Sequence, residues 1–208
     1  MGNETANGVT RVGIYGGTFS PPHNGHVHAA ETFLSLGGID RLLIVPTFVT
    51  PLKEREENTS PADRLAMCER AFAHLPATEV SDIEIRRAGK SYTAQTLAAL
   101  TAPDVRLSFL CGTDMLLSMG SWYEPATIFR LARIVCMRRE NEAENGRLLA
   151  ERAEEYRRRF AADIVFLSAP PKEMSSSQIR ERIGRGEDVS TLLPADVLAY
   201  INERGLYR

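Results

Sequence analysis

The sequence predicts an α/β protein, a Rossmann-like doubly wound parallel sheet with helices on both faces, and three observations support this prediction. Short apolar runs alternate with helical patterns along the whole chain, as expected when helices connect parallel strands. A glycine turn separates the first apolar run from the first helical pattern, which is how nucleotide-binding folds begin. No repeat or linker divides the 208 residues, so we expect one domain over residues 10–208 behind a loose tail at 1–9.

The expected strands are apolar runs typical of parallel strands buried on both faces. Their ranges are Arg11–Tyr15, Arg41–Val45, Thr78–Ile85, Arg106–Leu110, Arg133–Met137 and Asp163–Leu167. A Pro-, Thr- and Lys-rich segment from Pro46 to Thr59 follows the second strand, and loops of that length usually have a function.

Capping residues indicate where several helices begin. Ser60 and Pro61 provide an N-cap and an N1 proline, and Cys68 and Phe72 then fall on one helix face that should pack on the sheet. Ser91 is expected to cap the next helix. The remaining helices are expected over Gly25–Leu34, Ser91–Leu100 and Glu142–Phe160, the last of them exposed, and then from Ser175 and from Pro194.

Composition argues against several classes of function. Hydrophobic residues make up 43% and charged residues 25% of the chain, and the net charge is −2, so no general polyanion-binding surface is expected. The first ten residues lack the apolar core of a signal peptide, and no apolar run is long enough to span a bilayer. The three widely spaced cysteines, Cys68, Cys111 and Cys136, are typical of reduced core residues. We therefore expect a cytoplasmic protein.

The segment after the first strand contains the most informative residues of the chain. Gly16 and Gly17 allow a phosphate to approach main-chain N–H groups closely, and Thr18 and Phe19 continue this turn toward a helix N-terminus. His23 and His26, three residues apart at that helix start, place two imidazoles beside the same phosphate. Alternatively, the glycines form a structural turn and the histidines are a metal site or surface residues. A metal site would need further ligands, and His28 and His74 are the only other histidines of the chain.

Gly-Gly-Thr-Phe followed by His-Asn-Gly-His resembles the signature of the nucleotidylyltransferase superfamily. The resemblance implies that His23 and His26 contact ATP phosphates and stabilise the transition state. A second signature of that superfamily is matched by Ser175, Ser176, Ser177 and Arg180, which are expected to form another phosphate cradle. The alternative interpretation of these serines is an ordinary helix cap.

The middle of the chain is similar to bacterial nicotinate mononucleotide adenylyltransferases, and this resemblance implies the acceptor. Tyr92 and Trp122 would flank the pyridine ring, although a single tryptophan is also a frequent core residue. Thr93 and the Tyr123 N–H would bind the carboxylate. The resemblance also assigns Lys53 to catalysis and to the acceptor, Arg138 to the acceptor, and Gly112 and Asp114, just past the fourth strand, to ATP.

Several positions depart from the family pattern. Ser20 stands where the family usually has Asp, Leu52 where it has His before the lysine, and Gln95 where it often has Asp. The Arg-Pro-Gly that usually follows the fifth strand is replaced by residues 138–140, Arg-Arg-Glu. None of these changes removes His23.

The resemblance implies direct attack of the mononucleotide phosphate on the α-phosphorus of ATP, with Mg²⁺ carried by the ATP phosphates and no dedicated metal site. ATP and nicotinate mononucleotide are the expected partners, without nucleic acid or membrane, and the oligomeric state is left open. The nearest alternative enzyme is a phosphopantetheine or other mononucleotide adenylyltransferase. A non-catalytic nucleotide sensor of the same fold is a further alternative, whereas a nucleic-acid binder would need a more basic surface.

Overall fold

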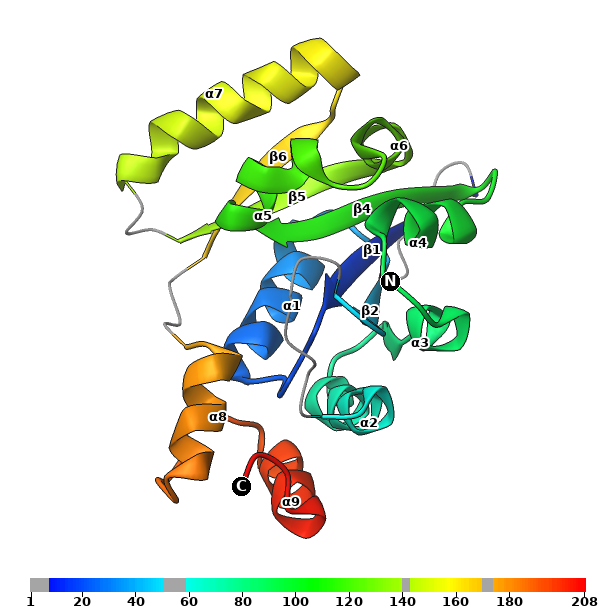
Figure 1. Cartoon of the computed structure of the whole chain (residues 1–208). Helices are drawn as coiled ribbons and strands as arrows, with labels where there is room; N and C mark the ends of the chain where they lie inside the picture. Colours follow the sequence, from blue (N-terminus) through cyan, green and yellow to red (C-terminus); the bar gives the residue numbers. More distant parts are fainter. Residues whose placement is uncertain (1–7, 51–58, 140–142, 170–173) are drawn as a thin grey trace, which may run out of the picture.

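A computed structural model describes residues 8–50, 59–139, 143–169 and 174–208. Its centre is a six-stranded parallel sheet of order β3-β2-β1-β4-β5-β6 (Figure 1), which confirms the predicted Rossmann-like sheet. The strands are β1 (Thr10–Gly17), β2 (Arg41–Pro46), β3 (Thr78–Val80), β4 (Val105–Gly112), β5 (Ala132–Arg139) and β6 (Ile164–Ala169).

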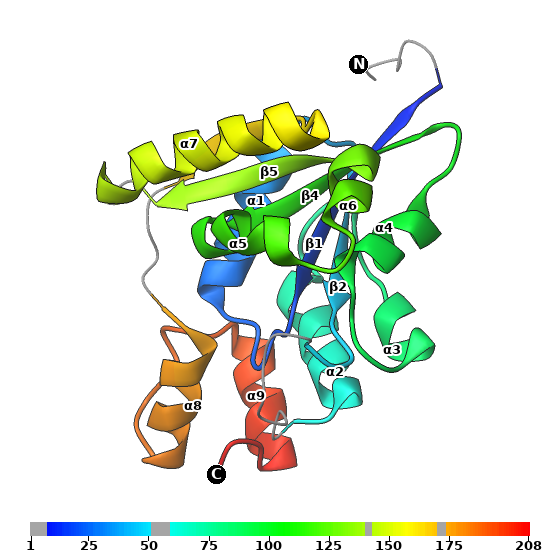
Figure 2. The ribbon, with the colours of Figure 1, turned by 45° about the horizontal axis from the view of Figure 1, so that its top comes forward.

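Helices cover both faces of this sheet (Figures 1 and 2). One face is covered by α1 (Asn24–Leu36), α2 (Pro61–Phe72), α8 (Ser176–Gly184) and α9 (Ala195–Arg204), whose apolar residues form one cluster with the sheet. The other face is covered by α4 (Thr93–Leu100), α5 (Thr113–Ser118), α6 (Pro125–Leu131) and α7 (Ala143–Phe160). The short helices α3 (Ile83–Arg87) and η1 (Met119–Ser121) complete the described elements.

Alternation along the central strands explains the two cores. Successive side chains of a strand point to opposite faces, so Leu43 and Val45 belong to the cluster with α4 to α7, whereas Leu42 and Ile44 belong to the cluster with α1 and α2. All four are at most 5% exposed. The strands therefore read as continuous apolar runs because both of their faces are buried.

The structure corrects the prediction of a strand over Thr78–Ile85. Only residues 78–80 pair with β2, and the chain then turns into α3. Glu84 is buried in α3, where its carboxylate accepts a hydrogen bond from the hydroxyl of Thr96 in α4. This contact between distant residues, which favours the helical turn, leaves no trace in the local alternation of apolar residues.

Three further expectations about helices were incomplete or wrong. Ser91 does not cap α4, because the N-cap is Tyr92 and the Ser91 hydroxyl instead accepts the main-chain N–H of Phe48 at 2.9 Å. Helix α7 is exposed on one side only, since Leu149 and Tyr156 lie in the core. Helices α5 and α6 were not predicted because they are too short to show a clear periodicity.

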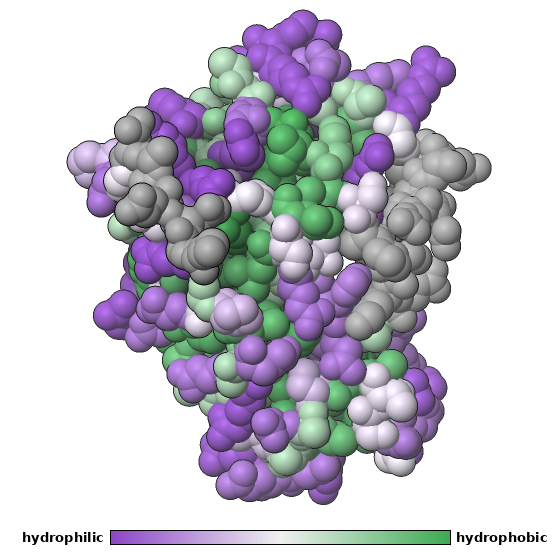
Figure 3. All heavy atoms as spheres, turned by 180° about the vertical axis from the view of Figure 1, so that it is seen from behind, coloured by the Kyte–Doolittle hydropathy of each residue, from purple (hydrophilic) through white to green (hydrophobic). Residues whose placement is uncertain are grey.

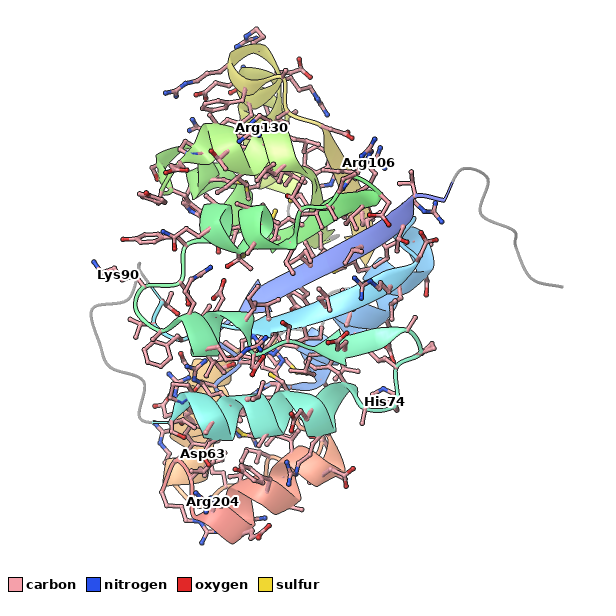
Figure 4. All side chains as sticks on the ribbon, turned by 90° about the vertical axis from the view of Figure 1, so that its right-hand side faces the viewer. Asp63, His74, Lys90, Arg106, Arg130 and Arg204 are labelled. Atoms are coloured by element: carbon pink, nitrogen blue, oxygen red, sulfur yellow. The ribbon has the colours of Figure 1, made fainter. Side chains whose placement is uncertain are left out.

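The predicted start of α2 is confirmed, and it also joins this helix to α9. Ser60 is the N-cap and its Oγ accepts the Asp63 N–H at 3.0 Å. Figure 4 shows Asp63 and Arg204 facing each other across α2 and α9, with Arg204 Nε 3.4 Å from Asp63 Oδ1. The Tyr200 hydroxyl donates to the same carboxylate at 2.8 Å. The polar start of α2 thus anchors the C-terminal helix.

The surface and the cysteines complete this description. Seen from behind (Figure 3), hydrophilic residues predominate around the edge of the molecule and hydrophobic residues reach the surface near its centre. In the part of the chain that the structure describes, no helix has the length and apolarity needed to cross a bilayer. Cys68, Cys111 and Cys136 are buried free thiols, as predicted for core residues.

Candidate active site

The candidate site lies at the carboxyl ends of the central strands. In open parallel sheets, ligands bind where neighbouring strands send their connections to opposite faces, and here this happens between β1 and β4. Gly16 and Gly17 end β1, and Gly112 ends β4. Asp114 follows in the first turn of α5, with an exposed side chain. The sheet therefore brings two of the three predicted ATP-binding segments, the ones that follow β1 and β4, to one switch point.

His23 and His26 begin helix α1 by capping it reciprocally. His23 is the N-cap, and its Nδ1 accepts the main-chain N–H of His26 at 3.3 Å. In return, His26 Nδ1 accepts the main-chain N–H of His23 at 3.1 Å. The two rings stack with centroids 3.7 Å apart. Because both Nδ1 atoms accept hydrogen bonds, each neutral imidazole carries its proton on Nε2.

Burial keeps both imidazoles neutral. Removal from water lowers the pKa of His23 to about 4, and it lowers the pKa of His26 well below its ordinary value, with the neighbouring His23 as a second cause. The ring of His26 packs edge-on against Phe19 with centroids 5.0 Å apart and also lies near Tyr15. At neutral pH the pair therefore offers two uncharged Nε2–H donors.

Gly25, between the two histidines, has a packing role that its sequence context does not reveal. A Cβ atom added to Gly25 would lie 3.0 Å from His23 Nδ1 and 3.1 Å from the Met174 side chain. The Gly25 N–H donates to the Met174 sulfur at 3.1 Å. Glycine therefore lets the His23 ring and the start of α8 approach the first turn of α1.

The second predicted phosphate cradle lies beside the first. Ser175 is the N-cap of α8 and accepts the Gln178 N–H at 3.2 Å. The Ser176 hydroxyl donates to the carbonyl oxygen of Pro21 at 2.9 Å. Arg180 Nη1 donates to the Ser20 carbonyl oxygen at 2.7 Å, and its Nη2 donates to Ser177 Oγ at 3.2 Å. The structure thus joins the two segments that the sequence predicted separately.

Ser20, the departure inside the first signature, is accounted for by a contact from the other end of the chain. Its side chain is buried, and its Oγ lies 3.2 Å from the hydroxyl of Tyr207. A cavity of about 500 Å³ opens beside this contact, lined by Ser177, Arg180, Glu181, Gly205, Leu206, Tyr207 and Arg208. A neutral hydroxyl suits this buried position because it pairs with another hydroxyl.

The residues expected at the acceptor are only partly brought together. The rings of Tyr92 and Tyr123 pack with centroids 4.4 Å apart, and Thr93 begins α4 directly after Tyr92. Trp122 instead packs edge-on against Phe109, with centroids 6.4 Å apart, and its Nε1–H donates to a serine hydroxyl of α5.

Two further residues were expected at the acceptor, Arg138 and Lys53. Arg138, in β5, places its guanidinium over the ring of Phe166, 5.1 Å from the centroid. Lys53 lies outside the described residues, as do residues 1–7 of the expected tail, Leu52 and Glu140. Among the described residues, no group of three or more His, Cys, Asp and Glu side chains is arranged to hold a metal ion.

Comparison with known proteins agrees with this geometry. Residues 14–182 match the family model described as cytidylyltransferase-like. A protein of Trichlorobacter lovleyi named probable nicotinate-nucleotide adenylyltransferase is 35% identical over 95% of this chain and 99% of its own length. One of Shigella boydii serotype 18 with the same name is 38% identical over 94% of this chain and 97% of its own length.

A solved structure shares the fold at lower identity. Nicotinic acid mononucleotide adenylyltransferase of Plasmodium falciparum, complexed with NaAD, superposes with a TM-score of 0.75 at 18% identity and covers 95% of this chain and 97% of that chain. The parallel sheet, the paired histidines and the near full-length identity of 35% and 38% to curated relatives agree. The chain belongs to the nicotinate-nucleotide adenylyltransferase family, within the cytidylyltransferase-like proteins.

Proposed function

We propose that this chain transfers the AMP part of ATP to nicotinate mononucleotide, giving nicotinate adenine dinucleotide and pyrophosphate. The observation that carries the proposal is the stacked, reciprocally capped pair His23 and His26 at the start of α1. The names of the curated relatives and the NaAD complex of the Plasmodium falciparum structure support the choice of acceptor.

The proposed reaction is a direct displacement at phosphorus. An oxygen of the nicotinate mononucleotide phosphate attacks the α-phosphorus of ATP, a new P–O bond forms, and the bond to the bridging oxygen breaks so that pyrophosphate leaves with its electron pair. Such transfers depend on positioning and on stabilisation of developing charge. The Nε2–H groups of His23 and His26 supply neutral donors to the phosphate oxygens, and Arg180 supplies a permanent positive charge.

The acceptor site is proposed around Tyr92, Thr93 and Tyr123, with Trp122, Lys53 and Arg138 as the further residues. The packed rings of Tyr92 and Tyr123 provide a flat apolar surface for a pyridine ring. Hydroxyl and N–H donors suit the pyridine carboxylate, since an amide in its place would leave a buried donor unpaired. Gly16, Gly17, Thr18, Phe19, Gly112, Asp114 and Ser175 to Ser177 are proposed for ATP.

We propose Mg²⁺ as the companion of ATP in this site. The described residues proposed for the phosphates offer mainly N–H, hydroxyl and guanidinium donors, which bind phosphate oxygens rather than a cation. This donor set fits an ion held by the phosphates and its own waters. When bound, Mg²⁺ neutralises part of the negative charge on the phosphates.

We propose the cytoplasm as the compartment, since buried free thiols persist where reductants are present.

A panel of acceptors tests the proposal. The protein is incubated with ATP, Mg²⁺ and one of nicotinate mononucleotide, nicotinamide mononucleotide or phosphopantetheine, and pyrophosphate is measured. We expect the nicotinate compound to be preferred and His26→Asn to lower kcat by two orders of magnitude or more, on the order of 3 kcal/mol. His74→Asn, which replaces an exposed histidine, is the matched control.

The same experiment separates the alternatives. Preference for phosphopantetheine would assign a different adenylyltransferase. Binding of ATP without pyrophosphate release from any acceptor would show a sensor of the same fold and would reject the proposed reaction.

A further inference from the structure

Arg64, in the first turn of α2, is a charged residue with only 1% of its surface exposed. Arginine stays protonated in proteins, and a buried charge is destabilising unless hydrogen bonds satisfy it. Arg64 Nη1 donates to the carbonyl oxygen of Thr18 at 2.9 Å, and Nη2 donates to the carbonyl oxygen of Phe48 at 3.0 Å. The guanidinium therefore bridges the loop after β1 and the loop after β2.

These two loops run side by side at the edge of the candidate site. Strands β1 and β2 pair as far as their last residues. Beyond them, the Thr47 N–H donates to the Gly17 carbonyl oxygen at 2.9 Å, and the hydroxyls of Thr18 and Thr50 lie 3.0 Å apart. Arg64 thus adds two hydrogen bonds from a charged group to the neutral hydrogen bonds that already join these two loops.

The residue after Thr18 has an unfavourable backbone conformation. Phe19 has a φ of 50° in the left-handed region, which is unfavourable for a residue with a side chain and persists only where the surroundings impose it. A trans peptide directs the Thr18 carbonyl and the Phe19 N–H to opposite sides. With the carbonyl held by Arg64, the Phe19 N–H faces away from α2.

We propose that Arg64 is a positioning residue that sets the phosphate-binding loop after β1 in its ATP-binding conformation before ATP arrives. This inference rests on the proposed function. Arg64 acts through Thr18 and Phe19 and not by contact with substrate. A guanidinium suits this role because its planar fork donates to two carbonyls at once, whereas the ammonium of lysine lacks that fixed geometry.

Kinetics of Arg64→Lys provide the first test, with Arg70→Lys as the matched control. Arg70 lies in the same helix, but it donates to the Ala66 carbonyl within α2 and stacks over Tyr200. At saturating ATP and nicotinate mononucleotide, and corrected for the folded fraction from urea unfolding, kcat should fall at least tenfold in Arg64→Lys and stay within twofold in Arg70→Lys. A lower urea midpoint with kcat within twofold of the wild type would show a merely structural role and overturn the proposal.

Hydrogen exchange of the wild-type protein tests the other part of the proposal, that the loops after β1 and β2 are ordered before ATP binds, and it needs no folded Arg64→Lys. The N–H groups of Thr47 and Phe48 are bonded to Gly17 and Ser91, so a preset loop protects them without ligand. We expect slow exchange in the free protein and no further slowing with a non-hydrolysable ATP analogue. Fast exchange that only the analogue slows would overturn the proposal, because the ligand would then order the loop. Absence of adenylyl transfer by the wild type would instead reject the proposed reaction.

Discussion

Replacing His23 with asparagine removes one source of acid sensitivity that the structure assigns to the start of α1. His23 is 6% exposed, and burial lowers its pKa from 6.5 to about 4. The folded protein therefore keeps this imidazole neutral where the unfolded chain protonates it. Asparagine retains an acceptor in place of Nδ1 and preserves the N-cap.

The size of the effect follows from the two pKa values. A pKa that is lower in the folded state gives a contribution that is fully present above pH 6.5 and is lost as the pH falls toward 4. Between pH 7 and pH 5, this histidine alone should lower the free energy of unfolding by about 2 kcal/mol, and by about 3 kcal/mol in total below pH 4.

Urea unfolding at pH 7 and pH 5, followed by circular dichroism, measures this difference. The wild type should lose about 2 kcal/mol more than His23→Asn between the two values, because other titrating groups contribute to both proteins. His74→Asn controls for the exchange of a histidine for asparagine at an exposed site. Equal losses in wild type and His23→Asn would refute the view that a buried neutral imidazole starts α1.

Three further predictions concern stability and accessibility. Asp63→Asn should lower the free energy of unfolding at pH 7 by about 1–2 kcal/mol. This difference between wild type and variant should shrink in acid, where the Asp63 carboxyl group is protonated; its pKa is lowered chiefly by the hydrogen bond from Ser60, the N-cap of α2. An unchanged urea midpoint at pH 7 would contradict this. Gly120→Ala should cost about 1–3 kcal/mol, seen as a lower Tm, because its Cβ would lie 2.8 Å from the buried ring of Tyr156. Gly146→Ala, in α7 with no atom within 4 Å, is its control and should not destabilise. The described thiols, such as Cys68, whose pKa burial raises, should react with Ellman's reagent only after unfolding, and rapid reaction of the native protein would contradict their burial.

The parts of the fold that could be predicted are those in which local sequence and tertiary packing agree. The strand at Arg41–Pro46 is buried on both faces and therefore reads as an unbroken apolar run. Ser60 and Pro61 mark the start of α2 because capping depends on neighbouring residues only. Thr78–Ile85 was misread because edge strand β3 pairs over three residues and Glu84 is then held by a residue of another helix.

In the candidate site, too, the residues in local motifs could be predicted and those held by distant contacts could not. His23, His26 and the serines of α8 could be predicted because each lies in a contiguous motif at a helix start. Nothing local distinguishes Arg64 from an exposed helical arginine, since its partners lie in two loops more than ten positions away. Trp122 was expected to flank the pyridine ring, and its edge-on contact with Phe109 leaves that expectation a prediction.

The contacts around Ser20 join a segment that is synthesised early to residues that are synthesised late. The phosphate loop after β1 is synthesised early, but its carbonyl at Ser20 is held by Arg180 and its hydroxyl by Tyr207, 187 positions later in the sequence. A nascent chain therefore carries His23 and His26 long before the residues that hold the loop preceding them. Contacts between residues so far apart in the sequence form late in folding, so the loop after β1 is held on both sides only once α8 and the C-terminal residues have been made.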